Sequence, residues 1–270
     1  MNVTTRLDAA DLRQIADPAE LRRIIREGGY AGRTGGLALG RVQANLVILP
    51  REHADDFLRF CQRNPKPCPL LAVSEPGDPT LPELGEGIDV RSDLPSYNVF
   101  RDGELAGEVT DVRDLWCDDF VAFALGCSFS FEEAIMAAGV PLPGNGGVTR
   151  IYDTSIDAAP AGPFRGRLVV SMRPFTPANA IRAIQITSRF PGVHGAPIHI
   201  GKPEQIGIRD LVEDDYNGAG PIPADQIPLF WACGITPQRA LAQARLPLAI
   251  SHTPGHMLIT DRLNASLAVF

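Results

Sequence analysis

The sequence predicts an α/β protein with a mainly parallel sheet and a smaller inserted α+β domain. From residue 167 onward, short apolar runs alternate with amphipathic segments, as parallel strands do when helices cover them. Residues 76–95 are rich in glycine and proline, which marks a change of organisation. The chain of 270 residues is long enough for two domains. We therefore expect a main domain of residues 1–75 plus 162–270 and a smaller domain of residues 76–161.

The first part of the chain is expected to alternate between helices and strands. Asp17-Pro18-Ala19-Glu20 predicts a helix start, with a capping aspartate, a proline at the first helical position and a glutamate in the first turn. This helix ends at Gly28-Gly29, because glycine favours a helix C-terminus. We further expect strands at 45–49 and 70–73 and a helix at 54–62 between them.

The smaller domain is expected to begin with a β-hairpin and to continue with two helices. Asp102-Gly103 is typical of a hairpin turn. Apolar residues at helical spacing predict a helix at about 112–125. A second helix, at 130–138, begins with a capping box, since Ser130 is followed three residues later by Glu133.

The remaining elements follow a rhythm of strand and helix. We expect strands at 152–156, 168–172, 197–200, 229–233, 248–251 and 257–260. Helices are expected to begin at Thr176-Pro177 and Thr236-Pro237, and a shorter one at 203–211, since proline is well placed in a first helical turn.

Composition excludes several classes of partner. The net charge is −7 and no block of lysine and arginine stands out, so neither nucleic acid nor an anionic membrane surface is an expected partner. The longest apolar runs are too short to span a bilayer, and the N-terminus lacks the apolar segment of a signal peptide. The cysteines are scattered without a C-x-x-C pair, which predicts free thiols in a cytoplasmic protein. The composition leaves open whether the protein forms a homo-oligomer.

Reactive side chains gather where the helix at 130–138 is expected to begin. Cys127 and Ser128 precede this helix, where free N–H groups and the positive end of the helix dipole favour an anion. Ser130 belongs to the same turn, and Glu132 has no capping role, so it is a candidate proton acceptor. The alternative is a well-capped joint between two helices, without a ligand.

Polar turns follow three of the expected strands, and two of them lead into a Thr-Pro helix start. Ligands in open parallel sheets bind beyond the carboxyl ends of the strands. These turns therefore place five candidates on one rim, namely Ser171, Arg173, Cys233, His252 and His256. Gly234, directly after Cys233, is a further candidate for substrate binding. Arg173 is the candidate for gripping a carboxylate, because a guanidinium donates two parallel hydrogen bonds. The alternative is a surface arginine that bonds a loop carbonyl.

Other polar residues extend this set of candidates. His194 lies on the loop before an expected strand, and Asn64 and Lys66 form a polar turn after a helix. His252 and His256 are four residues apart, but Pro254-Gly255 between them disfavours a helix. We therefore expect no metal site. No glycine-rich loop has the strand–turn–helix order of a dinucleotide site, which favours catalysis without a cofactor.

Several long and uncommon motifs resemble the D-glutamate cyclase family, whose bacterial members are also catalogued as hydro-lyases. They include Gln43–Pro50, Cys61–Leu71, Gly126–Glu132, Val169–Pro174, Phe230–Gly234 and His252–Met257, and the resemblance runs from about residue 17 to 261. It implies a two-domain α/β arrangement. It also implies an activity, since the eukaryotic relative converts D-glutamate to 5-oxo-D-proline and water.

These observations together predict an enzyme that eliminates water from a small carboxylate substrate. Arg173 would hold the carboxylate, Ser128 and helix-start N–H groups would hold the oxyanion, and Glu132 or His252 would move protons. Cys127 and Cys233 both precede expected helix starts, where the pKa of a thiol falls. That leaves a Cys-dependent amide hydrolase or acyl transferase as one alternative. A non-catalytic protein that binds small carboxylates is the other.

Overall fold

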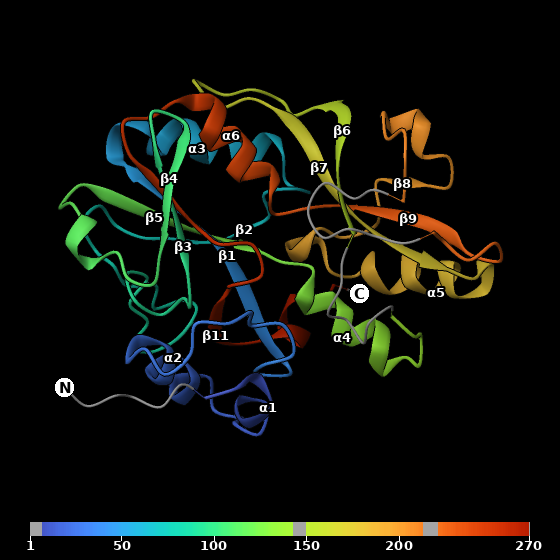
Figure 1. The fold of residues 1–270 in the computed structure, drawn as a ribbon, viewed down its shortest axis with the longest axis horizontal. Helices are drawn as coiled ribbons and strands as arrows, with labels where there is room; N and C mark the ends of the chain where they lie inside the picture. The colour runs from blue at the N-terminus through green and yellow to red at the C-terminus, as the bar shows by residue number, and fades with distance from the viewer. Residues whose placement is uncertain (1–6, 143–149, 213–220, 270) are drawn as a thin grey trace.

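The computed structural model describes residues 7–142, 150–212 and 221–269, which form two antiparallel sheets side by side (Figure 1). The larger sheet has the strand order β2-β5-β1-β10-β3-β4, with β11 also paired to β1. The smaller sheet has the order β6-β7-β9-β8. The larger sheet, with α2, α3 and α6 near it, is called the first half below. The smaller sheet, with α4 and α5, is called the second half.

The strands of the larger sheet are β1 (Arg41–Pro50), β2 (Leu70–Val73), β3 (Tyr97–Arg101), β4 (Glu104–Val109), β5 (Phe120–Gly126), β10 (Ala249–His252) and β11 (Leu258–Leu263). The strands of the smaller sheet are β6 (Arg150–Asp157), β7 (Arg167–Phe175), β8 (His199–Ile200) and β9 (Ile227–Ala232). The α-helices are α1 (Ala9–Leu12), α2 (Pro18–Arg26), α3 (Arg51–Arg63), α4 (Phe129–Ala137), α5 (Pro177–Thr187) and α6 (Thr236–Ala244). Short 3₁₀ turns include η1 (Arg113–Leu115), η3 (Pro191–Val193), η4 (Pro203–Ile206) and η5 (Asn264–Leu267).

Most of the predicted local elements are confirmed. Helix α2 begins at Pro18 and its cap Asp17 accepts a hydrogen bond from the Ala19 N–H. The hairpin of β3 and β4 turns at Asp102 and Gly103, whose φ angles are 51° and 85°. Both angles lie in the left-handed region that a tight hairpin turn requires.

The mixture of helices and strands is as predicted, but the expectation of a mainly parallel sheet is wrong. Every strand pairing among the described residues is antiparallel. A parallel sheet requires helices that connect neighbouring strands of the same sheet. Helix α6 instead carries the chain from β9 of the smaller sheet to β10 of the larger one. The alternation of strands and helices along the sequence therefore arises because the chain passes from one sheet to the other.

The helix predicted at 112–125 is also wrong. Only η1 is helical there, and residues 120–126 form strand β5. All seven residues of β5 are buried, because the strand lies inside the sheet between β1 and β2. A strand that is buried on both faces shows an unbroken apolar run, and such a run does not distinguish strand from helix. The helix expected at 203–211 is shorter, since only η4 forms.

The capping box predicted at Ser130 and Glu133 does not form. Residue Ser128 stands at the N-cap of α4 without a side-chain capping bond, and the Ser130 hydroxyl is buried without a hydrogen-bond partner. The Glu133 carboxylate accepts hydrogen bonds from the Gly40 N–H at 2.7 Å and from the Asn264 amide at 2.8 Å. Glu133 therefore ties α4 to the loops beside it, which a local capping pattern cannot reveal.

The two sheets divide the chain differently from the predicted domains. Strands β3, β4 and β5 fall within residues 76–161 yet pair inside the larger sheet, whereas β6 of the same range belongs to the smaller sheet. The domain boundaries themselves stay a prediction.

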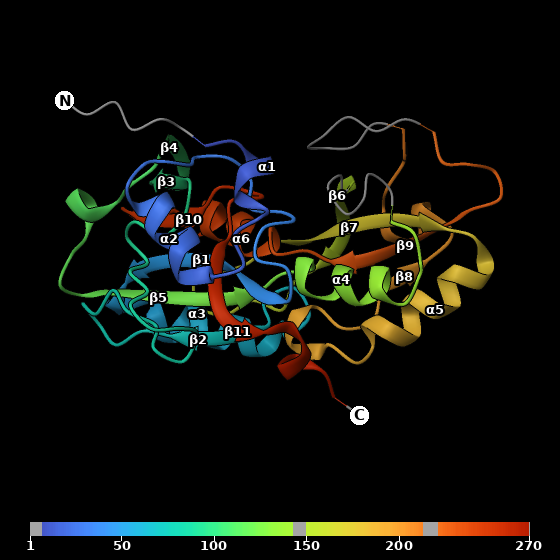
Figure 2. The same cartoon turned by 90° about the horizontal axis from the view of Figure 1, so that it is seen from below.

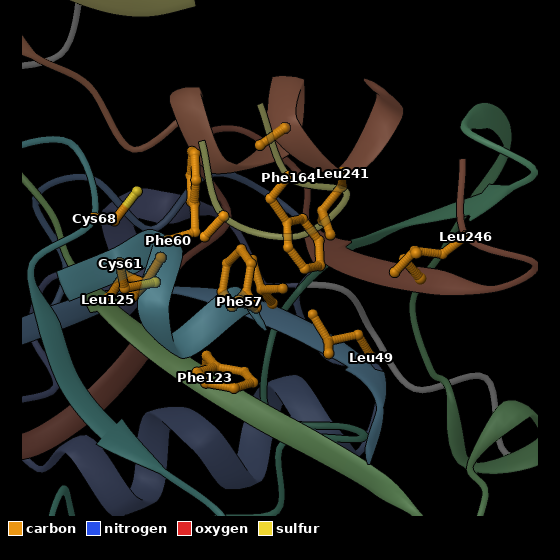
Figure 3. Packing of buried hydrophobic residues seen from close by; sticks show 14 of the residues in the cluster. Leu49, Phe57, Phe60, Cys61, Cys68, Phe123, Leu125, Phe164, Leu241 and Leu246 are labelled. Carbon is orange, nitrogen blue, oxygen red and sulfur yellow. The ribbon is translucent and has the colours of Figure 1, made fainter. Parts of the chain in front are cut away.

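Two apolar cores hold helices against the halves. In the first half, Phe57 of α3 packs edge-on against Phe123 and Phe164, with ring centroids 4.9 and 5.1 Å apart, and Leu241 of α6 joins the same cluster (Figure 3). In the second half, α4 lies beside α5 near the smaller sheet (Figure 2), and Phe131 of α4 lies 5.7 Å from the ring of Trp231.

These cores show that the chain crosses between the halves in opposite directions. Strand β5 belongs to the first half, but α4 directly after it packs in the second. Strand β9 belongs to the second half, but α6 directly after it packs in the first. The crossings fall at Gly126-Cys127-Ser128 and at Cys233-Gly234-Ile235.

Candidate active site

The two crossings border one cavity of about 500 Å³, a volume typical of small-molecule sites. The predicted candidates that line this cavity are Cys127, Ser128, Ser171, His194, Cys233, Gly234 and His252. They come from both sheets and from segments far apart in sequence. The structure therefore brings together most of the residues chosen from the turn before α4 and from the strand ends.

Asn45 of β1 holds the two crossings next to each other. Its amide nitrogen donates to the Gly126 carbonyl oxygen at 2.7 Å. A Cβ on Gly234 would lie only 2.3 Å from the same amide nitrogen, and a Cβ on Gly126 would lie 2.1 Å from the Gly192 carbonyl oxygen. Glycine is needed at both crossings because other groups approach the backbone closely.

Each crossing presents a thiol at the start of a helix. The Phe129 N–H is hydrogen bonded to Cys127 and the Ile235 N–H to Cys233. Both thiols keep some exposure to the cavity, yet burial raises the pKa of Cys127 to about 12 and that of Cys233 to about 11. Both are thiols at neutral pH when the cavity is empty. The lowered pKa expected at a helix start is thus outweighed by desolvation.

Arg173 lies behind the cavity, without lining it. Its guanidinium sits 5.5 Å from the ring centres of both Phe131 and Trp231, and it forms a buried ion pair with Glu132. Only 2% of Arg173 is exposed. Burial raises the pKa of the Glu132 carboxyl above its ordinary value, with the charge of Arg173 opposing that shift. Glu132 lies in this second layer and is absent from the cavity wall.

Two serine hydroxyls connect Arg173 to the cavity. The guanidinium donates to Ser128 Oγ at 3.0 Å and to Ser171 Oγ at 3.1 Å. A hydroxyl that accepts from an arginine must direct its own hydrogen elsewhere. Ser128 Oγ lies next to the Glu132 carboxylate, which can take its hydrogen. Ser171 lines the cavity, so its hydrogen can be donated to a ligand there.

His194 presents an imidazole nitrogen to the cavity. Its Nδ1 lies 2.6 Å from the Lys66 carbonyl oxygen, which assigns the proton to Nδ1 and leaves Nε2 as an acceptor. Burial lowers the pKa of His194 to about 4, so the ring is neutral at pH 7. The residue has a φ of 82°, an uncommon value outside glycine that often marks a functional position.

His252 is more firmly engaged by the protein. Its Nδ1 lies 3.1 Å from the Leu46 nitrogen and 3.2 Å from the Leu46 carbonyl oxygen. The Gln238 amide donates to the His252 carbonyl oxygen at 2.9 Å. Burial lowers the pKa of His252 to about 4. The ring is therefore neutral and held against β1.

The other predicted site residues lie away from the cavity wall and act in the scaffold. Asn64 follows α3 and its amide donates to the Phe60 and Ala159 carbonyl oxygens, both at 2.8 Å. The Lys66 ammonium donates to the Ala196 carbonyl oxygen at 2.6 Å. Further residues outside the wall are Glu132, Arg173, Ser130 and His256.

Two arginines that sequence reasoning missed also line the cavity. Arg13 follows α1 and Arg33 lies in the loop before β1. Within the described residues, neither guanidinium has a hydrogen bond or an ion pair. Arg33 passes beside Gly255, where an added Cβ would lie 3.3 Å from its side chain. The signal available in the sequence was Gly32-Arg33-Thr34-Gly35, a cation on a glycine-rich loop.

Over the residues described, no three His, Cys, Asp or Glu side chains are grouped so as to hold a metal ion. Within the same residues, no helix combines the length and apolar character needed to cross a bilayer.

Comparison with known proteins finds close relatives. The sequence profile of D-glutamate cyclase matches residues 121–261. A protein of Bordetella petrii is 64% identical over 90% of this chain and 93% of its own length, and one of Rhizobium johnstonii is 56% identical over 94% and 96%. Both are named putative hydro-lyase. A nitrogen repressor-like protein from Methanococcus jannaschii has a TM-score of only 0.39 at 11% identity over 88% of each chain, too low to support an argument.

Proposed function

Since the chain belongs to the D-glutamate cyclase family, we propose that it is a hydro-lyase acting on a small carboxylate substrate. The leading case is the conversion of D-glutamate to 5-oxo-D-proline and water. The observation that carries the proposal is the cavity between the halves, where two helix starts, hydroxyl donors and arginines surround a space of suitable volume.

The accessible arginines are the better candidates for the substrate carboxylate. Arg173 was the choice from sequence, but its guanidinium is occupied by Glu132 and two serines behind the wall. Arg13 and Arg33 line the cavity. We therefore assign carboxylate binding to Arg33 with Arg13 beside it, and assign Arg173 the role of positioning the serine hydroxyls.

Loss of water requires a donor for the developing oxyanion and a group that moves protons. Ser171 fits the first role, because its hydroxyl accepts from Arg173 and keeps its own hydrogen for the ligand. Such a donor typically contributes about 3 kcal/mol to the stabilisation of a transition state. His194 fits the second role through Nε2, since a neutral imidazole can accept the proton that the substrate amine loses. His252 is the alternative acceptor, because it lines the same cavity.

The test is NMR of the purified protein with D-glutamate and a panel of small hydroxy acids. We expect loss of water from at least one of them, a rate that falls at least 100-fold in Ser171→Ala, and little change in the control His199→Gln, whose ring lies outside the cavity wall. The absence of any dehydrated or cyclised product would contradict the proposal. A Cys-dependent acyl transferase would instead leave a thioester on Cys127, and a binding protein would leave every substrate unchanged.

A further inference from the structure

The two crossings are built in the same way. One consists of strand β5, then Cys127, then α4, and the other of strand β9, then Cys233, then α6. Each carries the chain from the sheet of one half to the helix layer of the other (Figure 2). Each places its thiol one or two residues before the N-cap of a nine-residue helix, with a backbone N–H bonded to the sulfur. The repetition gives the cavity one thiol from each half.

The thiols are close enough to affect one another. Burial raises the pKa of Cys127, and the charge that Cys233 would carry as a thiolate raises it further. The Asn45 amide bonds to Gly126 of one crossing and lies against Gly234 of the other. A buried imidazole nitrogen in the cavity, without a partner in the part of the chain that the structure describes, is a second indication that a ligand binds there. His194 is only 1% exposed, its Nδ1 is bonded to Lys66, and no partner for its Nε2 is found among the described residues.

Neither thiol has a part in the water loss proposed above, yet both line the cavity in which that scheme places the substrate. A carbon next to a carboxylate loses a proton more readily when the charge of the carboxylate is neutralised. The Arg33 guanidinium can neutralise that charge, and the Ser171 hydroxyl can donate a hydrogen bond to the same carboxylate. Cys127 and Cys233 then offer the cavity one acid–base group at each crossing.

We propose that Cys127 and Cys233 exchange the α-proton of the bound carboxylate substrate and so interconvert the two configurations at its α-carbon. One cysteine, which is a thiol while the cavity is empty, first releases its proton to solvent. As a thiolate it then takes the proton from the α-carbon and becomes a thiol again, and the C–H electron pair stays on the substrate as an enolate. The other cysteine, as thiol, donates its proton to the opposite face and becomes the thiolate. A proton passed through solvent restores the starting state. This inference rests on the proposed function, whose cavity and substrate class it uses.

Two groups from two halves suit this reaction for a geometric reason. A single base returns the proton to the face from which it came, so it can exchange the proton without inverting the carbon. Inversion requires a second acid that reaches the other face. Cys127 follows β5 and Cys233 follows β9, so the two thiols reach the cavity on separate segments of the chain.

The experiment follows α-deuterium and configuration together. The full-length protein is incubated in deuterated water with each enantiomer of glutamate, malate and 5-oxoproline, and the products are read by NMR and by chiral chromatography. Wild type is expected to place deuterium at the α-carbon of at least one pair and to form the opposite enantiomer. Cys127→Ser and Cys233→Ser are each expected to lose inversion at least 100-fold. Cys117→Ser is the matched control, since that thiol is exposed outside the cavity.

Cys127→Ser and Cys233→Ser are expected to differ in which enantiomer they still act on, and a folding defect would not produce that difference. Each retains one thiol, so each should exchange the α-proton of only one enantiomer, and the favoured enantiomer should differ between the two variants. Inversion that persists in both variants would overturn the proposal, as would the absence of α-deuterium in every substrate with wild type. Dehydration is measured in the same samples. Water loss without α-deuterium removes only this inference, whereas inversion without water loss removes only the proposed hydro-lyase activity.

Discussion

The amide nitrogen of Asn45 lies 2.7 Å from the Gly126 carbonyl oxygen and occupies the space that a side chain on Gly234 would need. One residue of β1 therefore sets the distance between both crossings. Because the thiols follow and precede these glycines directly, the geometry of the cavity depends on this contact. Asn45 is 4% exposed, so water cannot easily replace its bond.

The first prediction concerns Gly234→Ala. Its Cβ would lie 2.3 Å from the Asn45 amide, so either the amide or the second crossing must move. We expect a loss of about 1–3 kcal/mol in the free energy of unfolding, as for other overpacked sites, and a clear fall in activity. Gly107→Ala is the control, because a Cβ there meets nothing within 4 Å. Urea unfolding measures both, and equal stability of the two variants would contradict the contact.

The second prediction concerns the buried pair of Arg173 and Glu132. Arg173→Met leaves a buried carboxylate without its cation, so we expect a loss of about 3–5 kcal/mol at neutral pH. Replacing Glu132 with Met as well removes the unpaired charge and should restore most of that stability. The loss in the single variant should shrink as pH falls, since protonation of the carboxyl relieves its burial cost.

The double-mutant cycle decides whether the pair is coupled. Urea unfolding of wild type, both single variants and the double variant gives the coupling free energy. Additive losses would mean that Arg173 stabilises the protein through its aromatic neighbours, Phe131 and Trp231, rather than through Glu132.

The third prediction is that protonation of His194 lowers the free energy of unfolding as pH falls. Its pKa is about 4 in the folded protein against 6.5 as the ordinary value. A depressed pKa means that the unfolded chain binds the proton more tightly, so the stability is present above pH 6.5 and is lost as pH falls toward 4. The difference corresponds to about 3 kcal/mol.

The measurement compares the pH dependence of unfolding in wild type and His194→Gln. The variant should lose less stability between pH 6.5 and 4 than wild type does. Glu132, whose pKa is raised, acts in the opposite direction, but it is present in both proteins and cancels in the comparison. His53→Gln, a partly exposed imidazole on α3, is the control. Parallel curves for wild type and His194→Gln would contradict the assignment.

Local signals in the sequence were sufficient for most elements but not for their pairing. The Asp102-Gly103 turn and the Pro18 helix start depend on neighbours in the chain, so they could be predicted. Strand direction depends on where a helix leads the chain. The segment after Cys233 has the pattern of a parallel crossover, and only its packing with α3 reveals that it moves to the other half.

Part of the candidate site could also be predicted from local patterns in the sequence, whereas its arginines could not. Cys127 could be chosen because it precedes a helix start, and Ser171 because it belongs to a polar turn expected after an apolar strand. Both line the cavity, although Ser171 lies within β7. Arg173 was misplaced by one layer, because alternation along β7 does not show which polar residue reaches the cavity and which lies behind it. Arg33 was missed because its loop carries no pattern that predicts long-range contact with Gly255.

The last prediction tests the accessible cations. If Arg33 binds the substrate carboxylate, Arg33→Met removes a charged hydrogen bond and should raise KM by roughly 10- to 100-fold, corresponding to about 1.5–3 kcal/mol. The value of kcat should change less, because the carboxylate is held in both the ground state and the transition state. Arg51→Met, at an exposed arginine of α3 outside the cavity wall, is the matched control. Added salt should raise KM in wild type and have little effect in Arg33→Met, because exposed charges are screened. An unchanged KM in Arg33→Met would return the carboxylate to Arg173, which would then have to leave Glu132 when substrate binds.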